Sequence, residues 1–402
     1  MATVATVPAA GATVPAAGAT VAAAQGKKLK GQFYTVNSAY ILDGMPLPPP
    51  TARSVIEPFA GKGDLVDWLN SRQASAVPGP VPGPVPGPGP GPVPGPVPTT
   101  NVAMYDIDPK RVGVVQRDTL LDPPDYTDAW ILTNPPYLAR NKCASKAVFD
   151  KYDTNDLYKC FIRSLTQQTV GAAGGIFIIP AGFFLSPRDL DLRCRNEFLS
   201  KYRLLRVNYF EETVFPDTTT TVVAFAFERS ATLLKEQTVE WVSYPSRARR
   251  TFTMTLANDW IIGGEIYKLA ATVLAAGAVK VRRYVAGQKL KTGEQLTSMT
   301  LSALDSGTKE GRIALEYKEG YVYPAKECSR TYATLCVQGR ELGAEEQRRL
   351  CTEFNALIEK KRAETWSLFL PQFRESKEYA RKRIPFELAY SILVYLIGGL
   401  PH

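Results

Sequence analysis

Histidine is almost absent from this sequence, because His402 is the only one among 402 residues. This scarcity excludes a catalytic triad or a metal site built on histidine. The six cysteines lie far apart and form no C-x-x-C pair, which argues against a zinc ribbon or a disulfide framework and favours a reducing compartment. No run of about eighteen apolar residues occurs, and no basic start precedes an apolar core. We therefore expect neither a membrane span nor secretion.

Positive charge is concentrated in the second half of the chain. The formal net charge is +9, with 48 Lys and Arg against 39 Asp and Glu. Residues 231–402 contain 26 basic and 19 acidic residues, a balance of +7, and residues 1–230 contain 22 and 20, a balance of +2. A basic half beside a nearly neutral half suggests that one part holds a polyanion while the other performs chemistry. A solubilising surface is the alternative.

Two segments have a composition too simple to form a core. Residues 1–25 repeat Ala, Thr, Val, Pro and Gly, and we expect a disordered tail there. Residues 76–98 repeat Val-Pro-Gly-Pro, and proline cannot donate a backbone hydrogen bond to a sheet. Because this repeat lies between two strand candidates, we interpret it as an insertion within a domain. A linker between domains is the alternative.

Apolar strand candidates alternate with helix candidates through the first 230 residues. We expect strands at 54–59, 102–107, 113–116, 129–133, 175–179, 204–210 and 220–228, and helices at 64–72, 155–170 and 188–202. This alternation predicts an α/β fold with a doubly wound, mainly parallel sheet of about seven strands that ends in a hairpin. In such sheets ligands bind at the carboxyl ends of the strands. Residues 231–402, with helices at 344–366 and 385–396, are predicted to form a separate α+β module.

The first chemical motif runs from a strand into a glycine turn. Glu57 is followed by Gly61 and Gly63, which permit close approach of a ligand to the backbone. No third glycine stands at the spacing of dinucleotide sites, so a nicotinamide site is poorly supported. The carboxylate of Glu57 suits a cationic ligand group better than a pyrophosphate. A purely structural glycine turn is the alternative.

Two acidic residues follow later strands. Asp106 ends the second strand candidate, where an acidic side chain can bind the hydroxyls of a ribose. Asp118 follows the next strand candidate and could accept a hydrogen bond from an adenine amine. Each residue could instead be an ordinary turn or surface aspartate.

The sequence Asn134-Pro135-Pro136-Tyr137 follows the strand candidate at 129–133. The amide oxygen of Asn134 can accept a hydrogen bond from a planar exocyclic amine. Pro135 fixes the backbone, so its carbonyl can accept the other amine hydrogen. Tyr137 offers an aromatic face for stacking on a base. A proline-rich turn after a strand is the alternative.

With these motifs, the chain resembles S-adenosylmethionine-dependent adenine-N6 DNA methyltransferases of the gamma class, in which the cofactor motif precedes the catalytic motif. The resemblance extends well over about residues 30–230 and implies a Rossmann-like catalytic domain at 26–230, with a C-terminal target-recognition module at 231–402. Gly31-Gln32-Phe33-Tyr34-Thr35 resembles the leading motif of the family, although Val36 replaces its usual proline.

The resemblance implies a role for each motif. It places Thr35, Phe59, Gly61, Gly63 and Asn134 at the S-adenosylmethionine site, together with Glu57 at the amino group of the cofactor, Asp106 at its ribose and Asp118 at its adenine. It implies that residues 134–137 hold the target base. No metal is expected.

Later motifs extend the resemblance. Residues 156–158 resemble the helical motif after the catalytic loop, and 175–180 resemble the strand that follows it. Phe215 lies where the family has an aromatic residue that stacks on the extruded base, although a hydrophobic anchor between two strands is an alternative. Residues 374–376 and 381–384 resemble a terminal block of restriction–modification methyltransferases from bacteria and large DNA viruses.

We expect a monomer that acts on double-stranded DNA wherever that DNA is replicated, including the cytoplasm. A separate cognate restriction endonuclease could exist. The basic residues expected to contact DNA, mostly its phosphates, are Arg247, Arg249, Arg250, Arg282, Arg283, Arg381, Lys382 and Arg383.

Other functions compatible with the motifs are methylation of an RNA base amine or of a protein glutamine, whose side chain is also a planar amide. A non-enzymatic DNA-binding module would need a degraded site, yet the candidate site residues are all present. Cytosine-N4 enzymes usually carry serine at the position of Asn134, which favours adenine as the target.

Overall fold

The computed structural model describes residues 35, 37–76, 101–215, 220–273, 278–305, 312–326, 331–372 and 381–399. The predicted tail at 1–25 lies outside these ranges, as does the predicted insertion at 76–98 apart from Ala76. Of the leading motif only Thr35 is described.

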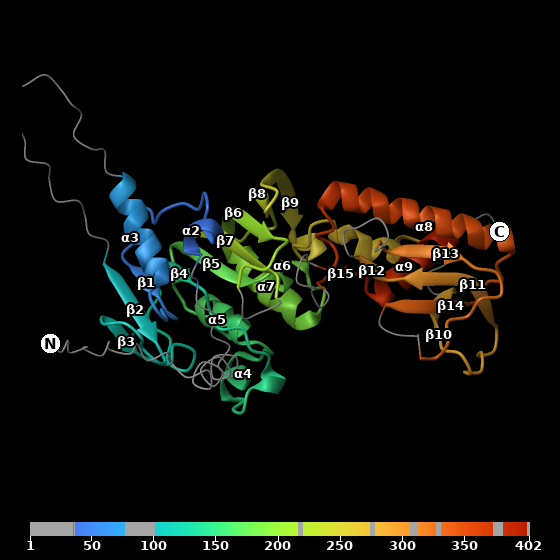
Figure 1. The fold of residues 1–402 in the computed structure, drawn as a ribbon, viewed down its shortest axis with the longest axis horizontal. Helices are drawn as coiled ribbons and strands as arrows, with labels where there is room; N and C mark the ends of the chain where they lie inside the picture. The colour runs from blue at the N-terminus through green and yellow to red at the C-terminus, as the bar shows by residue number, and fades with distance from the viewer. Residues whose placement is uncertain are drawn as a thin grey trace, which may run out of the picture.

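A nine-stranded sheet forms the larger part of the molecule, with the order β3-β2-β1-β4-β5-β7-β6-β8-β9 (Figure 1). Its strands are β1 (Val55–Glu57), β2 (Val102–Asp106), β3 (Val114–Gln116), β4 (Trp130–Thr133), β5 (Gly174–Pro180), β6 (Tyr202–Phe210), β7 (Val222–Arg229), β8 (Glu236–Tyr244) and β9 (Ala248–Thr255). All four residues of β4 are buried, as are six of the seven in β5. Burial on both faces is typical of central parallel strands.

Strand direction brings the chemical motifs to one edge of this sheet. β1 pairs in parallel with β2 and β4, β2 with β3, and β4 with β5. β7 is antiparallel to both β5 and β6, so β6 runs in the same direction as β5. The carboxyl ends of β1, β2, β4 and β5 therefore meet at a single edge, where ligands of such sheets bind.

Helices connect the strands and complete the doubly wound arrangement. Along the chain, α3 follows β1 and precedes β2, α5 follows β4 and precedes β5, and α7 follows β5 and precedes β6 (Figure 1). The helices of this part are α2 (Ser38–Ile41), α3 (Asp64–Ala76), the short 3-10 helix η1 (Arg140–Lys142), α4 (Ala147–Tyr152), α5 (Leu157–Thr166), α6 (Gly182–Leu185) and α7 (Asp189–Lys201). The expected α/β fold with a mainly parallel sheet is thus observed.

The sheet is larger than the sequence predicted. The expected hairpin is present as β6 and β7, but β8 pairs in parallel with β6, and β9 pairs with β8. Nine strands therefore replace the expected seven. The fully buried side chain of Trp241 on β8 belongs to the same apolar core as the first seven strands, which explains the extension. The large sheet consequently continues to Thr255, beyond the predicted boundary at residue 230.

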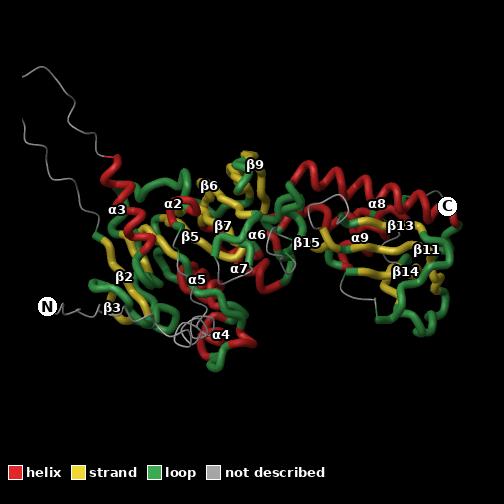
Figure 2. The backbone as a smooth tube through the Cα atoms, viewed as in Figure 1, coloured by secondary structure: helices red, strands yellow, loops and turns green. Residues whose placement is uncertain are grey.

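A second, antiparallel sheet has the order β10-β14-β11-β13 and its own apolar core (Figure 2). The helices predicted near 344–366 and 385–396 are observed as α8 and α9, which pack beside it. The elements of this region are the 3-10 helices η2 (Leu256–Asn258) and η3 (Gly264–Thr272), β10 (Lys280–Tyr284), β11 (Glu294–Ser302), β12 (Leu304–Asp305), β13 (Ala314–Tyr317), β14 (Tyr332–Gln338), α8 (Ala344–Thr365), β15 (Lys382–Arg383) and α9 (Phe386–Gly398).

The two-stranded pair of β12 and β15 lies between the two sheets along the long axis of the molecule (Figure 1). Within the described part of the chain, no helix combines the length and apolarity needed to cross a membrane.

Candidate active site

A cavity of about 360 Å³ opens at the carboxyl edge of the large sheet. Its walls include Phe59, Gly61, Asp106, Asp118 and Asn134, which the sequence predicted as cofactor-binding residues. These residues lie at or just after the ends of four separate strands, so their convergence is a property of the fold. We call this space the first cavity.

The glycine turn after β1 has the conformation that the motif predicts. Gly61 and Gly63 have φ values of 53° and 81°, in the left-handed region that favours glycine. A Cβ atom on Gly63 would lie 2.4 Å from Nη1 of Arg111, so a side chain would not fit without movement. The amide of Gly61 donates a hydrogen bond of 2.8 Å to Oδ2 of Asp106, which ties the turn to the end of β2.

Glu57 carries the most unusual carboxyl group of the site. Its side chain is 1% exposed, and among the described residues its buried Oε2 has no hydrogen-bond partner. Burial raises the pKa of Glu57 well above its ordinary value, and the nearby charges of Asp64 and Asp106 add to this effect. An unpaired buried carboxyl oxygen is costly unless a cation or a donor reaches it. Glu57 does not itself belong to the cavity wall.

Asp106 is held rigidly at the end of β2. Its Oδ1 accepts a hydrogen bond from the amide of Asp108, and its Oδ2 accepts the bond from Gly61, both at 2.8 Å. Ile107, which follows it, is 53% exposed and also lines the first cavity. An exposed aliphatic side chain beside a carboxylate provides an apolar surface for a flat ring and an acceptor for hydroxyl groups.

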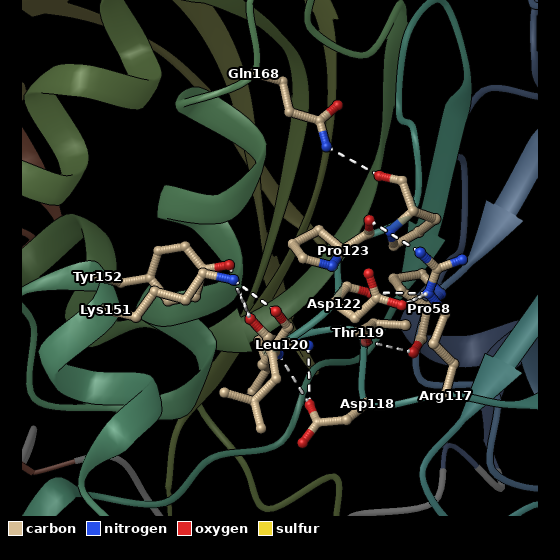
Figure 3. A network of polar contacts seen from close by, with 12 residues as sticks. Pro58, Arg117, Asp118, Thr119, Leu120, Asp122, Pro123, Lys151, Tyr152 and Gln168 are labelled. Atoms are coloured by element: carbon tan, nitrogen blue, oxygen red, sulfur yellow. Dashed lines mark hydrogen bonds and ion pairs between the residues drawn. The ribbon is translucent and has the colours of Figure 1, made fainter.

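A polar network fixes the loop that carries Asp118 (Figure 3). The Thr119 hydroxyl donates to the Pro58 carbonyl at 3.0 Å, which joins this loop to the β1 turn. The Tyr152 hydroxyl donates to the Leu120 carbonyl at 2.8 Å. Oδ1 of Asp118 accepts from the amides of Leu120 and Leu121 at 3.1 Å each. The Asp118 carboxylate is therefore oriented by its own backbone at the cavity wall.

Asn134 directly follows the last residue of β4, and it is 9% exposed. Its amide nitrogen donates to the hydroxyl of Thr35 at 3.1 Å, and its Oδ1 lies in a short contact with the Tyr137 hydroxyl. The Tyr137 hydroxyl also lies 2.7 Å from the carbonyl of Ile178 on β5. The structure thus brings together Thr35 and Asn134, which are 99 residues apart in the chain.

The loop at 134–137 lies between the first cavity and another one. Asn134 and Pro136 line the first cavity, whereas Tyr137 lines a second cavity of about 350 Å³. Leu138 lines both. The ring of Tyr137 packs edge-on against Tyr158, with centroids 6.3 Å apart. One short loop therefore has a separate space on each side.

The second cavity contains charged groups that the sequence did not reveal as site residues. Lys159 and Asp191 form an ion pair on its wall, with side chains 6% and 9% exposed. Asp156, on the same wall, has its pKa raised to about 6 by burial, despite the opposing charge of Lys159.

Phe215 is buried in the same apolar core as Tyr137, but unlike Tyr137 it does not line the second cavity. Its side chain is 2% exposed and belongs to the apolar core of the large sheet. Residues 216–219 directly after it are outside the described ranges. The position agrees with the hydrophobic-anchor alternative, and stacking on a base would require the Phe215 side chain to leave this packing.

The basic residues predicted to contact DNA occupy several environments. Arg282 pairs with the carboxylate of Glu294 through Nε at 2.7 Å and Nη2 at 2.5 Å. Lys382 is 6% exposed and donates to the Trp366 carbonyl at 2.7 Å, and burial lowers its pKa to about 8. These two positions argue against the predicted DNA contacts, because both cations serve partners within the fold.

The other predicted contacts are more accessible. Arg249 is 63% exposed, and Arg247 forms an ion pair with Asp43. Arg250 donates to the Ala363 carbonyl at 2.6 Å. Arg283 and Arg383 line a further cavity beside the start of α9. Arg381 is partly buried.

No group of three or more His, Cys, Asp or Glu side chains in the described ranges could hold a metal ion.

No protein-family model and no curated protein matches this chain. Several solved structures are similar to parts of it. A type I restriction-modification system methyltransferase subunit from Streptococcus thermophilus is 13% identical, covering 52% of this chain and 47% of that chain, with a TM-score of 0.35. The type IIG restriction endonuclease BpuSI is 15% identical, covering 67% and 37%, with a TM-score of 0.36. The ATP-dependent type ISP restriction-modification enzyme LlaBIII bound to DNA is 12% identical, covering 68% and 23%, with a TM-score of 0.34. The match spans less than half the length of each of these three proteins.

Proposed function

We propose that this chain is an S-adenosylmethionine-dependent methyltransferase that methylates the exocyclic N6 amine of adenine in double-stranded DNA. The observation that carries the proposal is the position of the 134–137 loop between two cavities. A group-transfer enzyme needs a donor site and an acceptor site that meet at the reacting atoms. The loop provides such a meeting point, with Asn134 on one side and Tyr137 on the other.

The first cavity suits a cationic cofactor that also carries a ribose and an adenine. Within the described ranges, its charged lining consists of three carboxylates and one guanidinium, from Asp106, Asp108, Asp118 and Arg117. Glu57 is not part of the cavity lining, and its unpartnered Oε2 would accept a hydrogen bond from the amino group of such a ligand if binding opens the turn after β1. Asp106 would accept from the ribose hydroxyls, and Ile107 would cover the adenine ring. Bound there, S-adenosylmethionine would supply a methyl group already activated by its sulfonium.

The second cavity would receive the target adenine. A base within a stacked duplex cannot reach the loop, so it must be extruded into a pocket. Asn134 Oδ1 and the Pro135 carbonyl would accept the two hydrogens of the amine and hold its nitrogen toward the methyl carbon. The nitrogen would bond to that carbon as the carbon–sulfur bond breaks, and the amine would then lose one proton. Tyr137, with Phe215 after rearrangement, would pack against the base.

In the free protein, the Tyr137 hydroxyl occupies Oδ1 of Asn134. We propose that this contact keeps the amide oriented before the base arrives, because a fixed acceptor needs no reorganisation at the moment of reaction. The Thr35 hydroxyl holds the other end of the same amide. Asn134 is thus positioned from two sides.

The experiment that tests the substrate class compares three possible methyl acceptors in separate reactions. The protein is incubated with S-adenosylmethionine labelled in its methyl group and with equal amounts of unmethylated DNA, RNA or protein extract. Label in DNA alone is the expected result. Label confined to RNA or to protein would replace DNA as the substrate while leaving methyl transfer intact, and cofactor binding without any transfer would contradict the proposed activity.

A further inference from the structure

We infer that Arg188, Arg283 and Arg383 form a phosphate-binding groove that holds the DNA strand beside the target base. The inference rests on the proposed function, since it assumes that the second cavity receives a base from a nucleic acid. Arg188 was not among the basic residues predicted from the sequence to contact DNA. Of the predicted residues, Arg283 and Arg383 line the groove, whereas their chain neighbours Arg282 and Lys382 do not.

The three guanidinium groups gather around one cavity of about 470 Å³. Arg188 lies in the loop before α7, Arg283 on β10 and Arg383 on β15, so three separate elements supply them. The remaining lining comes from the first turns of α9, with Phe386, Glu387 and Tyr390. Among the described residues, a single carboxylate faces three guanidinium groups, so this lining is positive. Guanidinium groups bind phosphate oxygens in paired, planar hydrogen bonds.

Arg188 connects this groove to the proposed base pocket. It lines both the groove and the second cavity, whose wall also includes Tyr137 and Lys142. Arg188 is exposed, and among the described residues its guanidinium has no carboxylate partner. A strand whose base enters the second cavity has its phosphates within reach of this residue. The next phosphates along that strand would then lie toward Arg283 and Arg383.

Strand geometry explains why adjacent residues differ. On β10, Arg282 is opposite Cys336 and Arg283 is opposite Leu335, and successive strand residues point to opposite faces. Arg282 turns to Glu294, whereas the Arg283 guanidinium lies 5.7 Å from the centroid of the Phe386 ring on α9.

The same alternation applies on β15. Lys382 is buried against the Trp366 carbonyl, and Arg383 lines the groove. One member of each pair is therefore turned into the fold, and the other lines the groove.

The test measures binding of a mixed-sequence DNA duplex, by fluorescence anisotropy, as a function of salt concentration. The variants are Arg188→Ala, Arg283→Ala and Arg383→Ala. Each phosphate contact contributes a slope of about 0.9 to the plot of log affinity against log salt. Each substitution should therefore reduce the slope by about 1, which corresponds to a loss of up to about eightfold in affinity at 0.1 M salt relative to 1 M.

Arg203→Ala is the matched control, because Arg203 is 58% exposed and pairs with Glu228. It lies near the start of β6, at the sheet edge opposite the site, and its slope should equal that of the wild type. The Lys variants Arg188→Lys, Arg283→Lys and Arg383→Lys should recover most of the slope. Where an alanine variant does not fold, as judged by thermal unfolding, the glutamine variant Arg188→Gln, Arg283→Gln or Arg383→Gln replaces it, and because glutamine also removes the charge the slope should again fall by about 1.

Unchanged slopes in all three groove variants would overturn the inference. A reduced slope in Arg203→Ala as large as theirs would do the same, since any surface arginine would then account for the effect. Failure of the proposed function looks different: the wild-type protein itself would transfer no methyl group to DNA. Calorimetric titration of S-adenosylmethionine separates the cases further, because the groove variants should bind the cofactor as tightly as the wild type.

Discussion

At the scale of single residues, Asn134 is the group on which the proposed chemistry depends. Its amide nitrogen is tied to Thr35 and its amide oxygen lies against the Tyr137 hydroxyl, so its orientation is set before any ligand binds. Preorganised hydrogen-bonding groups of this kind typically contribute on the order of 10²–10³ to the rate. The two partners can be altered separately, which allows orientation and chemistry to be distinguished.

Asn134→Ala should lower kcat for methyl transfer by at least about 10²-fold, because the amine loses its acceptor. Binding of S-adenosylmethionine, measured by calorimetry, should survive. Thr35→Ala is the control, since it removes the hydrogen bond to the amide but keeps the amide oxygen, and its loss of kcat should be much smaller. Near-normal turnover of Asn134→Ala would refute its assignment as a catalytic residue.

The raised pKa of Glu57 predicts that the free energy of unfolding depends on pH. Because its pKa is raised on folding, the folded protein keeps a proton that the unfolded chain releases above its ordinary pKa of 4.5. The free energy of unfolding should therefore fall as pH rises from 4.5 toward the folded pKa, by about 1.4 kcal/mol per pH unit from this group. Glu57→Gln removes the contribution, so the variant should gain stability relative to the wild type as pH rises.

Denaturant unfolding of both proteins at a series of pH values checks this prediction. A stability difference that does not change between pH 4 and pH 8 would contradict the burial of an unpaired carboxyl group. The same residue links stability to binding. If a ligand ammonium reaches Glu57, cofactor binding should release a proton, detectable in calorimetry as a heat that varies with the ionisation enthalpy of the buffer.

The sequence predicted much of the first cavity but little of the second. Asp106, Asp118 and Asn134 follow recognisable strands, and parallel strands place their carboxyl ends together, so convergence could be inferred. Lys159 and Asp191 come from different helices, and only the packing of α5 on α7 brings them together. No local pattern marks such a pair.

The directions of basic side chains were equally hard to predict. Arg282 and Arg283 are adjacent in the chain, yet one pairs with Glu294 and the other lines the groove. The register of β10 against β14 decides between them, and this register depends on residues more than fifty positions away. Lys382 was predicted as a DNA contact because it stands in a basic cluster, but the fold buries it.

At the scale of elements, the loop at 134–137 depends on its neighbours β4 and β5. The Tyr137 hydroxyl bonds to the Ile178 carbonyl in β5, and its ring packs on Tyr158 in α5. Two parts of one side chain thus have separate tasks. The hydroxyl anchors the loop, and the ring packs on Tyr158, which lines the second cavity together with Tyr137.

Tyr137→Phe should reduce stability by about 1–2 kcal/mol, because buried acceptors lose a donor, but it should retain stacking. Tyr137→Ala should also remove the stacking surface, worth about 1–3 kcal/mol per base. The measurement is the fluorescence of 2-aminopurine placed at the methylated position of a duplex, which rises when the base leaves the stack. Equal fluorescence for the wild type and Tyr137→Ala would refute the stacking role.

The extension of the sheet by β8 and β9 was missed because the segment after residue 230 shows only short, mixed apolar runs. In β8 the buried residues near its start alternate with exposed ones, Gln237 and Val239 pointing inward. This pattern would fit a strand in any sheet. The sheet that β8 joins is determined by the backbone hydrogen-bonding edge of β6 that β7 does not occupy. Local periodicity predicts a strand but not its partner.

At the scale of the whole molecule, the proposed active site and the groove lined by Arg188, Arg283 and Arg383 are next to each other. The proposed base pocket is lined mostly by residues of the large-sheet part, with Pro371 and Gln372 from the region beyond residue 255. Two of the groove arginines, Arg283 and Arg383, belong to the same later region. The Pro-Gly repeat connects α3 to β2, and Asn101 at its end accepts a hydrogen bond from Val55 at the amino end of β1. This attachment is at the sheet edge opposite the site.

Replacing residues 78–98 by a short Gly-Ser linker should therefore leave both cofactor affinity and kcat/KM for DNA within about twofold of the wild type, since long surface insertions change little in a fold. A larger loss of either quantity, in a variant that keeps its thermal stability, would show that the repeat contributes to the site.

The most direct measurement of the central claim is the identity of the methylated nucleoside. The protein is incubated with tritiated S-adenosylmethionine and unmethylated duplex DNA, and the DNA is digested to nucleosides and separated. The expected result is label in N6-methyldeoxyadenosine with the wild type and no label there with Asn134→Ala. Label in a methylated cytosine, or no label in DNA while the protein binds the cofactor, would contradict it.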